Sequence, residues 1–168
     1  MDIKELLEED AFDPQKLFNE EEYSTLILDR EGFTKKENQV ADLLMQLLDK
    51  DVTREEAEAV FSRLKELNAT QLLLQGISEA KRPSEKAKLV AACWETGLDF
   101  SKEFLFFTEL LCHPDFELAV EAITVAENTE NLSPEQIDAA LQLLQTSKEG
   151  SSDLKDALKE HLNLIKNG

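Results

Sequence analysis

Apolar residues recur every three or four positions along most of this chain, which is the spacing of one face of an α-helix. Residues 35–50 show the pattern, because Val40 and Leu44 lie on the same stripe as the later leucines. Thr34 and Thr53 each precede an apolar stripe and are followed three positions later by glutamate. This arrangement is typical of a capping box at a helix N-terminus, so we expect a helix to begin after each threonine.

Two consecutive stretches, 70–99 and 101–130, repeat one pattern at a spacing of thirty-one residues. Each stretch has a hydroxyl residue that is expected to cap a first helix, then a proline, a second cap and a residue that tolerates positive φ. The matched positions are Thr70 with Ser101, Pro83 with Pro114, Ser84 with Asp115, and Gly97 with Asn128. A repeat of this length indicates helical units stacked side by side.

The chain is therefore predicted to be all-α, with residues 1–33 as an acidic cap segment and residues 34–168 as one helical-repeat domain. Phe104 and Phe107 lie in a run that is apolar nearly all round, which predicts a helix at the centre of the core. The four expected helical hairpins span about 34–67, 70–97, 101–128 and 133–166.

The net charge of −18 is distributed unevenly. Residues 32–90 are neutral overall, whereas residues 91–147 contain eleven acids and a single base, Lys102. Such a surface repels phosphate and makes nucleic acid an unfavourable partner, but it suits a basic protein. The alternative is that the acids only maintain solubility.

Membrane insertion is not indicated, because no stretch approaches the roughly 20 apolar residues that a spanning helix needs. The first residues, 1–5, are also too acidic for a signal peptide. We therefore expect a cytoplasmic protein.

Few residues suit catalysis or metal binding. The two histidines, His113 and His161, are far apart in the chain, and the two cysteines, Cys93 and Cys112, lack the spacing of a metal or redox motif. His113 is expected at a helix end, where a positive charge is favourable. The single tryptophan, Trp94, is expected in the core. We predict no catalytic residues, no cofactor and no metal.

The helical pairs, with a proline and an acid before the second helix, resemble the HEAT and armadillo-like α-solenoid class. The best match is 113–123, where Pro114 and Asp115 precede an apolar helix. The chain departs from the class pattern near Val120 and Glu121, where a basic residue is common. The resemblance implies a right-handed α–α superhelix over about residues 34–166.

Members of that class mostly bind other proteins on the face formed by the second helices. Carried over to this chain, the resemblance places the candidate partner-binding residues on the second helices of the two repeats. These residues are Glu95, Glu117, Glu121 and Thr124.

Together the pattern, the charge and the resemblance favour a non-catalytic protein–protein interaction scaffold that binds a basic partner through an acidic face. One alternative is a small acidic chaperone or nucleic-acid mimic that shields a basic client. A less favoured alternative is an enzyme on helical repeats, such as a DNA glycosylase, which needs a basic groove that this composition does not offer. The residues indicate neither the identity of the partner nor the oligomeric state.

Overall fold

The computed structural model describes residues 26–168, and within them the chain forms eight α-helices, one short 3₁₀ helix and no β-strand. The prediction of an all-α fold is confirmed. In chain order the helices are α3 (Lys35–Leu47), α4 (Arg54–Glu66), α5 (Thr70–Glu79), α6 (Pro83–Glu95), η1 (Ser101–Glu103), α7 (Phe104–Leu111), α8 (Phe116–Glu127), α9 (Pro134–Thr146) and α10 (Ser152–Asn167).

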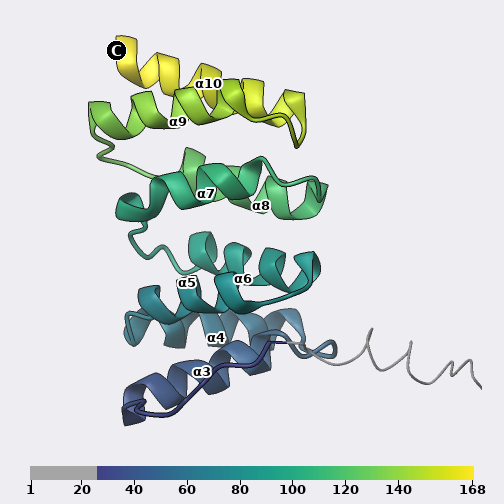
Figure 1. Ribbon diagram of the computed structural model, residues 1–168. Helices are drawn as coiled ribbons and strands as arrows, with labels where there is room; N and C mark the ends of the chain where they lie inside the picture. The colour runs from purple at the N-terminus through teal and green to yellow at the C-terminus, as the bar shows by residue number, and fades with distance from the viewer. Residues whose placement is uncertain (1–25) are drawn as a thin grey trace, which may run out of the picture.

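The helices pack in the order in which they occur along the chain, from α3 at one end of the molecule to α10 at the other (Figure 1). Consecutive helices form the packed pairs α3–α4, α5–α6, α7–α8 and α9–α10. Between pairs, α6 packs against α8 and α8 against α10, while α3 packs against α5 and α7 against α9. The helices α6, α8 and α10 therefore form one continuous row.

The helix caps test the local predictions directly. At Thr34, the side chain accepts the backbone N–H of Glu37 at 3.1 Å, and the Glu37 carboxylate accepts the backbone N–H of Thr34 at 2.8 Å. Thr53 forms the same capping box before α4, and Asp115 caps α8 by accepting the backbone N–H of Leu118 at 3.0 Å. These three predicted helix starts are confirmed.

The predicted caps at Thr70, Ser84 and Ser101 are wrong. Thr70 is the first residue of α5, because Asn68 adopts a positive φ of 53° and turns the chain directly from α4 into α5. Ser84 lies inside α6, which begins at Pro83, where the fixed φ of proline suits the first helical position. Ser101 begins η1, because its N–H is held by the Asp99 carboxylate at 2.9 Å.

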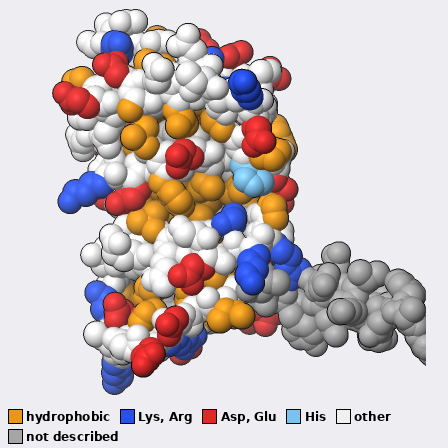
Figure 2. Space-filling view, viewed as in Figure 1, with side chains coloured by type: hydrophobic (Ala, Val, Ile, Leu, Met, Phe, Trp, Pro, Cys, Tyr) orange, Lys and Arg blue, Asp and Glu red, His pale blue; other side chains and the backbone are white. Residues whose placement is uncertain are grey.

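The centre of the core is confirmed at Phe104 and Phe107, which are both fully buried. The ring of Phe107 makes edge-to-face contacts with Phe100 and Phe106, at centroid distances of 5.5 and 5.3 Å. The helix still has one side at the surface, since Leu105 is exposed to solvent. On the face of the molecule that Figure 2 shows, hydrophobic side chains reach the surface in a band across the middle.

The connection between α9 and α10 comes close to the end of α7. Gly150 has a positive φ of 90°, and a Cβ atom at this position would lie 2.7 Å from the carbonyl oxygen of Cys112. Only glycine allows this approach without moving the backbone. This contact fixes the last helical pair against the preceding one.

Most of the predicted cap segment 1–33 falls in residues 1–25, which lie outside the described residues. The chain enters the described fold at Leu26, whose side chain is buried and lies against Gly76 of α5. No helix among residues 26–168 is long and apolar enough to cross a membrane.

Candidate partner-binding surface

The predicted binding residues come from the outward sides of two adjacent helices, which we call the α6–α8 surface. Glu95 lies in the last turn of α6, beside Trp94. Glu117, Glu121 and Thr124 lie four and three positions apart on α8, so that they share one face of that helix. Because α6 and α8 pack directly against each other, the two sets belong to one continuous surface.

Trp94 does not lie in the core, and the prediction that it would is wrong. Its side chain is 38% exposed, and its indole N–H donates to the carboxylate of Glu121 on α8 at 2.8 Å. The inward positions of this part of α6 are taken by Val90 and Cys93, which are buried. Residue 94 follows Cys93 by about 100° around the helix axis, which turns the indole toward the surface.

Glu95 is engaged by the neighbouring helix α4. Its carboxylate lies 3.3 Å from the guanidinium of Arg54, which also pairs with Glu58 at 3.1 Å. The hydrogen bond with Glu58, followed by the charge of Glu95, raises the pKa of Arg54 above its usual value. The structure therefore gives Glu95 a counter-charge within the molecule, unlike the glutamates on α8.

The two predicted binding glutamates of α8, Glu117 and Glu121, lie without a neighbouring cation. No lysine or arginine among residues 26–168 lies within ion-pair distance of Glu117 or Glu121. The hydroxyl of Thr124 donates to the carbonyl of Val120 within the same helix at 2.9 Å. Glu117 and Glu121 therefore give this side of α8 an uncompensated negative charge, next to the Trp94 indole.

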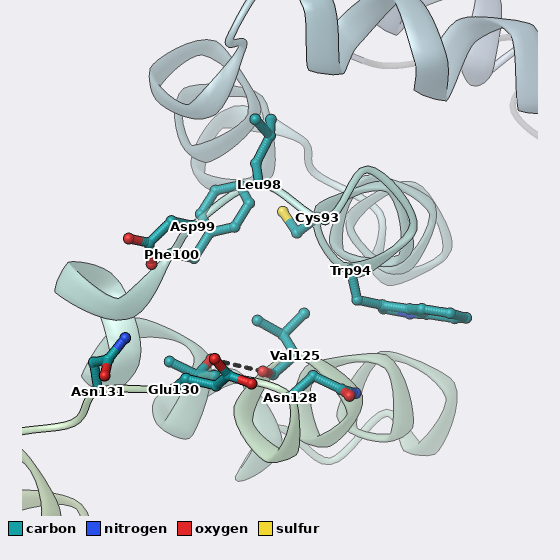
Figure 3. A pocket seen from close by; sticks show the side chains of 11 residues that line it. Cys93, Trp94, Leu98, Asp99, Phe100, Val125, Asn128, Glu130 and Asn131 are labelled. Carbon is teal, nitrogen blue, oxygen red and sulfur yellow. Dashed lines mark hydrogen bonds between the residues drawn. The ribbon is translucent and has the colours of Figure 1, made fainter.

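A pocket of about 340 Å³ adjoins this surface, where α6 and α8 end (Figure 3). Trp94 stands on one side of the pocket, and Asp99 on the opposite side. The other lining residues are Cys93, Gly97, Leu98, Phe100, Val125, Asn128, Thr129, Glu130 and Asn131.

The sequence pattern does not indicate this pocket, because most of its residues follow the ends of α6 and α8. Gly97 has the predicted positive φ, at 71°, but Asn128 does not, since its φ is −97°. The positive φ occurs instead at Asn131, at 61°.

The backbone N–H of Ser101 lowers the pKa of Asp99, so this carboxyl on the pocket wall stays ionised at neutral pH.

His113 and the two cysteines have surroundings that explain them as parts of the fold. His113 accepts the backbone N–H of Asp115 through Nδ1 at 2.9 Å, so the ring holds the turn before α8 as a hydrogen-bond acceptor. Cys93 and Cys112 are both buried. Burial raises the pKa of the Cys93 thiol, and the charge of Glu103 adds to this effect. Among the described residues, no three His, Cys, Asp or Glu side chains are grouped so that they could hold a metal ion.

These features define an all-α protein with sequentially packed helices and an acidic surface that contains one exposed tryptophan. No protein-family model matches the chain, and comparisons with curated proteins and with solved structures also find no match.

Proposed function

We propose that this protein is a non-catalytic interaction scaffold that binds a basic partner protein through the α6–α8 surface. The observation that carries the proposal is the exposed indole of Trp94, which is hydrogen-bonded to Glu121, with Glu117 one turn before Glu121 on α8. Tryptophan is among the residues that contribute most binding energy at protein interfaces. Carboxylates around it select a positively charged partner and accelerate its association.

The arrangement of the helices supports this choice of surface. In the proposal, the packed pairs form a right-handed superhelix of the HEAT and armadillo-like kind, and the row of second helices provides the binding face. The row α6–α8–α10 offers a partner several parallel ridges along one side of the molecule. An extended or helical basic segment lying across α6 and α8 would contact Trp94, Glu117 and Glu121 together.

The charge of the surrounding chain favours a basic partner over a neutral one. Residues 91–147, which include all of α7, α8 and α9, contain eleven acids and one base. Of the acids on the α6–α8 surface, Glu95 already has Arg54 as a partner, whereas Glu117 and Glu121 do not. A lysine or arginine from another protein would supply the missing positive charge.

A designed peptide tests this proposal. The probe is an amphipathic helical peptide with arginine and lysine along one face, titrated by calorimetry at physiological salt. The double variant Glu117→Lys with Glu121→Lys reverses two charges on α8. It is expected to weaken binding about tenfold or more, since interfacial charge pairs contribute on the order of 1.5 kcal/mol. Trp94→Ala should weaken binding by a similar factor.

The matched control is the double variant Glu79→Lys with Glu109→Lys. Both residues are exposed, near the C-terminal ends of α5 and α7, and the control changes the net charge by the same amount. It should leave the affinity for the peptide nearly unchanged. An equal loss in both double variants would refute the α6–α8 surface as the site, and would indicate the general acidic shield of a small chaperone or nucleic-acid mimic.

A further inference from the structure

We propose that the pocket at the C-terminal ends of α6 and α8 receives an arginine side chain of the partner. This inference rests on the proposed function, because it assigns a place to one cationic side chain of the same basic segment. The pocket adjoins the α6–α8 surface through Trp94, which belongs to both.

Two helix ends make this pocket electronegative. The C-terminus of an α-helix carries a partial negative charge of about half a unit, because its last carbonyl groups lack partners within the helix. Cationic side chains in the last turn often offset this charge, but α6 and α8 both have no basic residue there. The pocket therefore lies at the ends of two helix dipoles that no basic side chain of the last turn offsets, although Thr96, Asn128 and Thr129 donate hydrogen bonds to carbonyls there.

Two carboxylates add full charges to these partial ones. Asp99 and Glu130 line the pocket, and both side chains are exposed. Neither lies within ion-pair distance of a lysine or arginine in residues 26–168. The charge of Lys102 acts on Asp99 without forming an ion pair, so a cation entering the pocket would meet the Glu130 carboxylate and two helix ends without displacing an existing ion pair.

The inner part of the pocket is apolar. Cys93, Phe100 and Val125 line it and are buried, and Figure 3 shows the Cys93 sulfur and the Val125 side chain between the two helices. An apolar floor with an acidic rim suits a side chain that has a methylene stem and a cationic head. The volume of about 340 Å³ corresponds to roughly ten water molecules, so one long side chain fits with some solvent.

Two neighbouring residues favour arginine over lysine. Trp94 is one of the lining residues, and a planar guanidinium stacks on an indole face better than an ammonium does. Asn128 donates its amide hydrogen to the Thr124 carbonyl at 2.7 Å, which leaves the Asn128 side-chain oxygen as an acceptor. The guanidinium has five N–H donors in a fixed fork, so it can reach such an acceptor and a carboxylate at the same time.

The test uses the full chain and three small probes: the N-acetyl amides of arginine, lysine and citrulline. Citrulline has almost the shape of arginine but carries no charge. Because the chain has a single tryptophan, the indole N–H resonance of Trp94 reports binding without ambiguity. The arginine probe should shift this resonance to saturation with a Kd of roughly 1–10 mM. The lysine probe should bind more weakly, and the citrulline probe should not saturate.

A pair of variants localises the effect. Glu130→Gln removes a carboxylate from the pocket wall, whereas Glu127→Gln removes an exposed carboxylate of α8 that does not line the pocket. Glu130→Gln should weaken binding of the arginine probe about tenfold, the loss expected for a charge-assisted hydrogen bond. Glu127→Gln should change it less than about twofold, since exposed charges outside the pocket are screened by solvent.

Failure of this inference can be distinguished from failure of the proposed function. The pocket assignment is overturned if the arginine probe does not saturate, if citrulline binds equally well, or if Glu130→Gln has no effect. In each of these cases the loss of peptide binding in the Glu117 and Glu121 double variant would still support the α6–α8 surface. If the arginine probe behaves as expected but that double variant still binds the peptide, the pocket assignment holds and the proposed surface is wrong.

Discussion

Replacing Phe107 with alanine should destabilise the protein strongly. The side chain is 0% exposed, lies at the centre of α7 and contacts the rings of Phe100 and Phe106 edge to face. Truncating a buried phenylalanine costs about 3–5 kcal/mol, and each aromatic pair contributes roughly 0.5–1.5 kcal/mol to such a total. We therefore expect a loss of about 4 kcal/mol, which is a large part of the 5–15 kcal/mol that is typical of a whole domain.

Phe116 provides a control with the same chemical change. Its side chain is 62% exposed at the start of α8, so Phe116→Ala should cost only about 1 kcal/mol or less. The measurement is urea unfolding followed by circular dichroism. With a denaturant slope of about 2 kcal/mol per molar, the midpoint should fall by about 2 M for Phe107→Ala and by about 0.5 M or less for Phe116→Ala.

Equal midpoints for the two alanine variants would refute the placement of Phe107 at the core. If Phe107→Ala does not fold, Phe107→Leu gives a second measurement. Leucine keeps most of the apolar volume but loses both edge-to-face contacts, so a cost of about 1–3 kcal/mol is expected. A Phe107→Leu variant as stable as the unmodified chain would contradict the contribution assigned to the two rings.

Three further predictions concern backbone, cap and thiols. Gly150→Ala should lower the free energy of unfolding by more than about 2 kcal/mol, because φ is positive and a Cβ there meets the carbonyl of Cys112. Gly97→Ala should lower it by only about 1 kcal/mol, because φ is positive but the space around Gly97 is open. Equal losses for the two variants in urea unfolding would contradict this difference. Asp115→Ala should lower the free energy of unfolding by about 1 kcal/mol through loss of the α8 cap, and an unchanged midpoint would contradict that cap. Cys93 and Cys112 are buried, and the pKa of Cys93 is raised. Ellman's reagent at pH 8 should therefore label both thiols only upon unfolding. Rapid labelling of Cys93 in the native protein would contradict its burial.

Features with local causes could be predicted from the sequence. The capping boxes at Thr34 and Thr53 depend on residues three positions apart, and the burial of Phe104 and Phe107 follows from a dense apolar run. The wrong prediction of a cap at Ser101 also has a local cause, since the Asp99 carboxylate accepts the Ser101 N–H. The choice between a cap and a tight turn depends, however, on how the chain enters α7.

Features that depend on neighbouring helices could not be predicted. Trp94 has a large, mostly apolar side chain of the kind found in cores. Its position around α6 and its hydrogen bond to Glu121 on α8 nevertheless keep it at the surface. The pairing of Glu95 with Arg54 joins residues from α4 and α6 that the sequence separates widely. The pocket has the same origin, since its lining converges from the ends of two helices and the segments after them.

The order in which the helices pack has a consequence for how the chain folds. Because each helix contacts mainly helices close to it in the chain, the loops that must close during folding are short. Chains whose contacts are local fold faster than chains of similar size that join distant segments. We therefore expect rapid folding that can begin during synthesis, with each helical pair completed on the ribosome before the next one emerges.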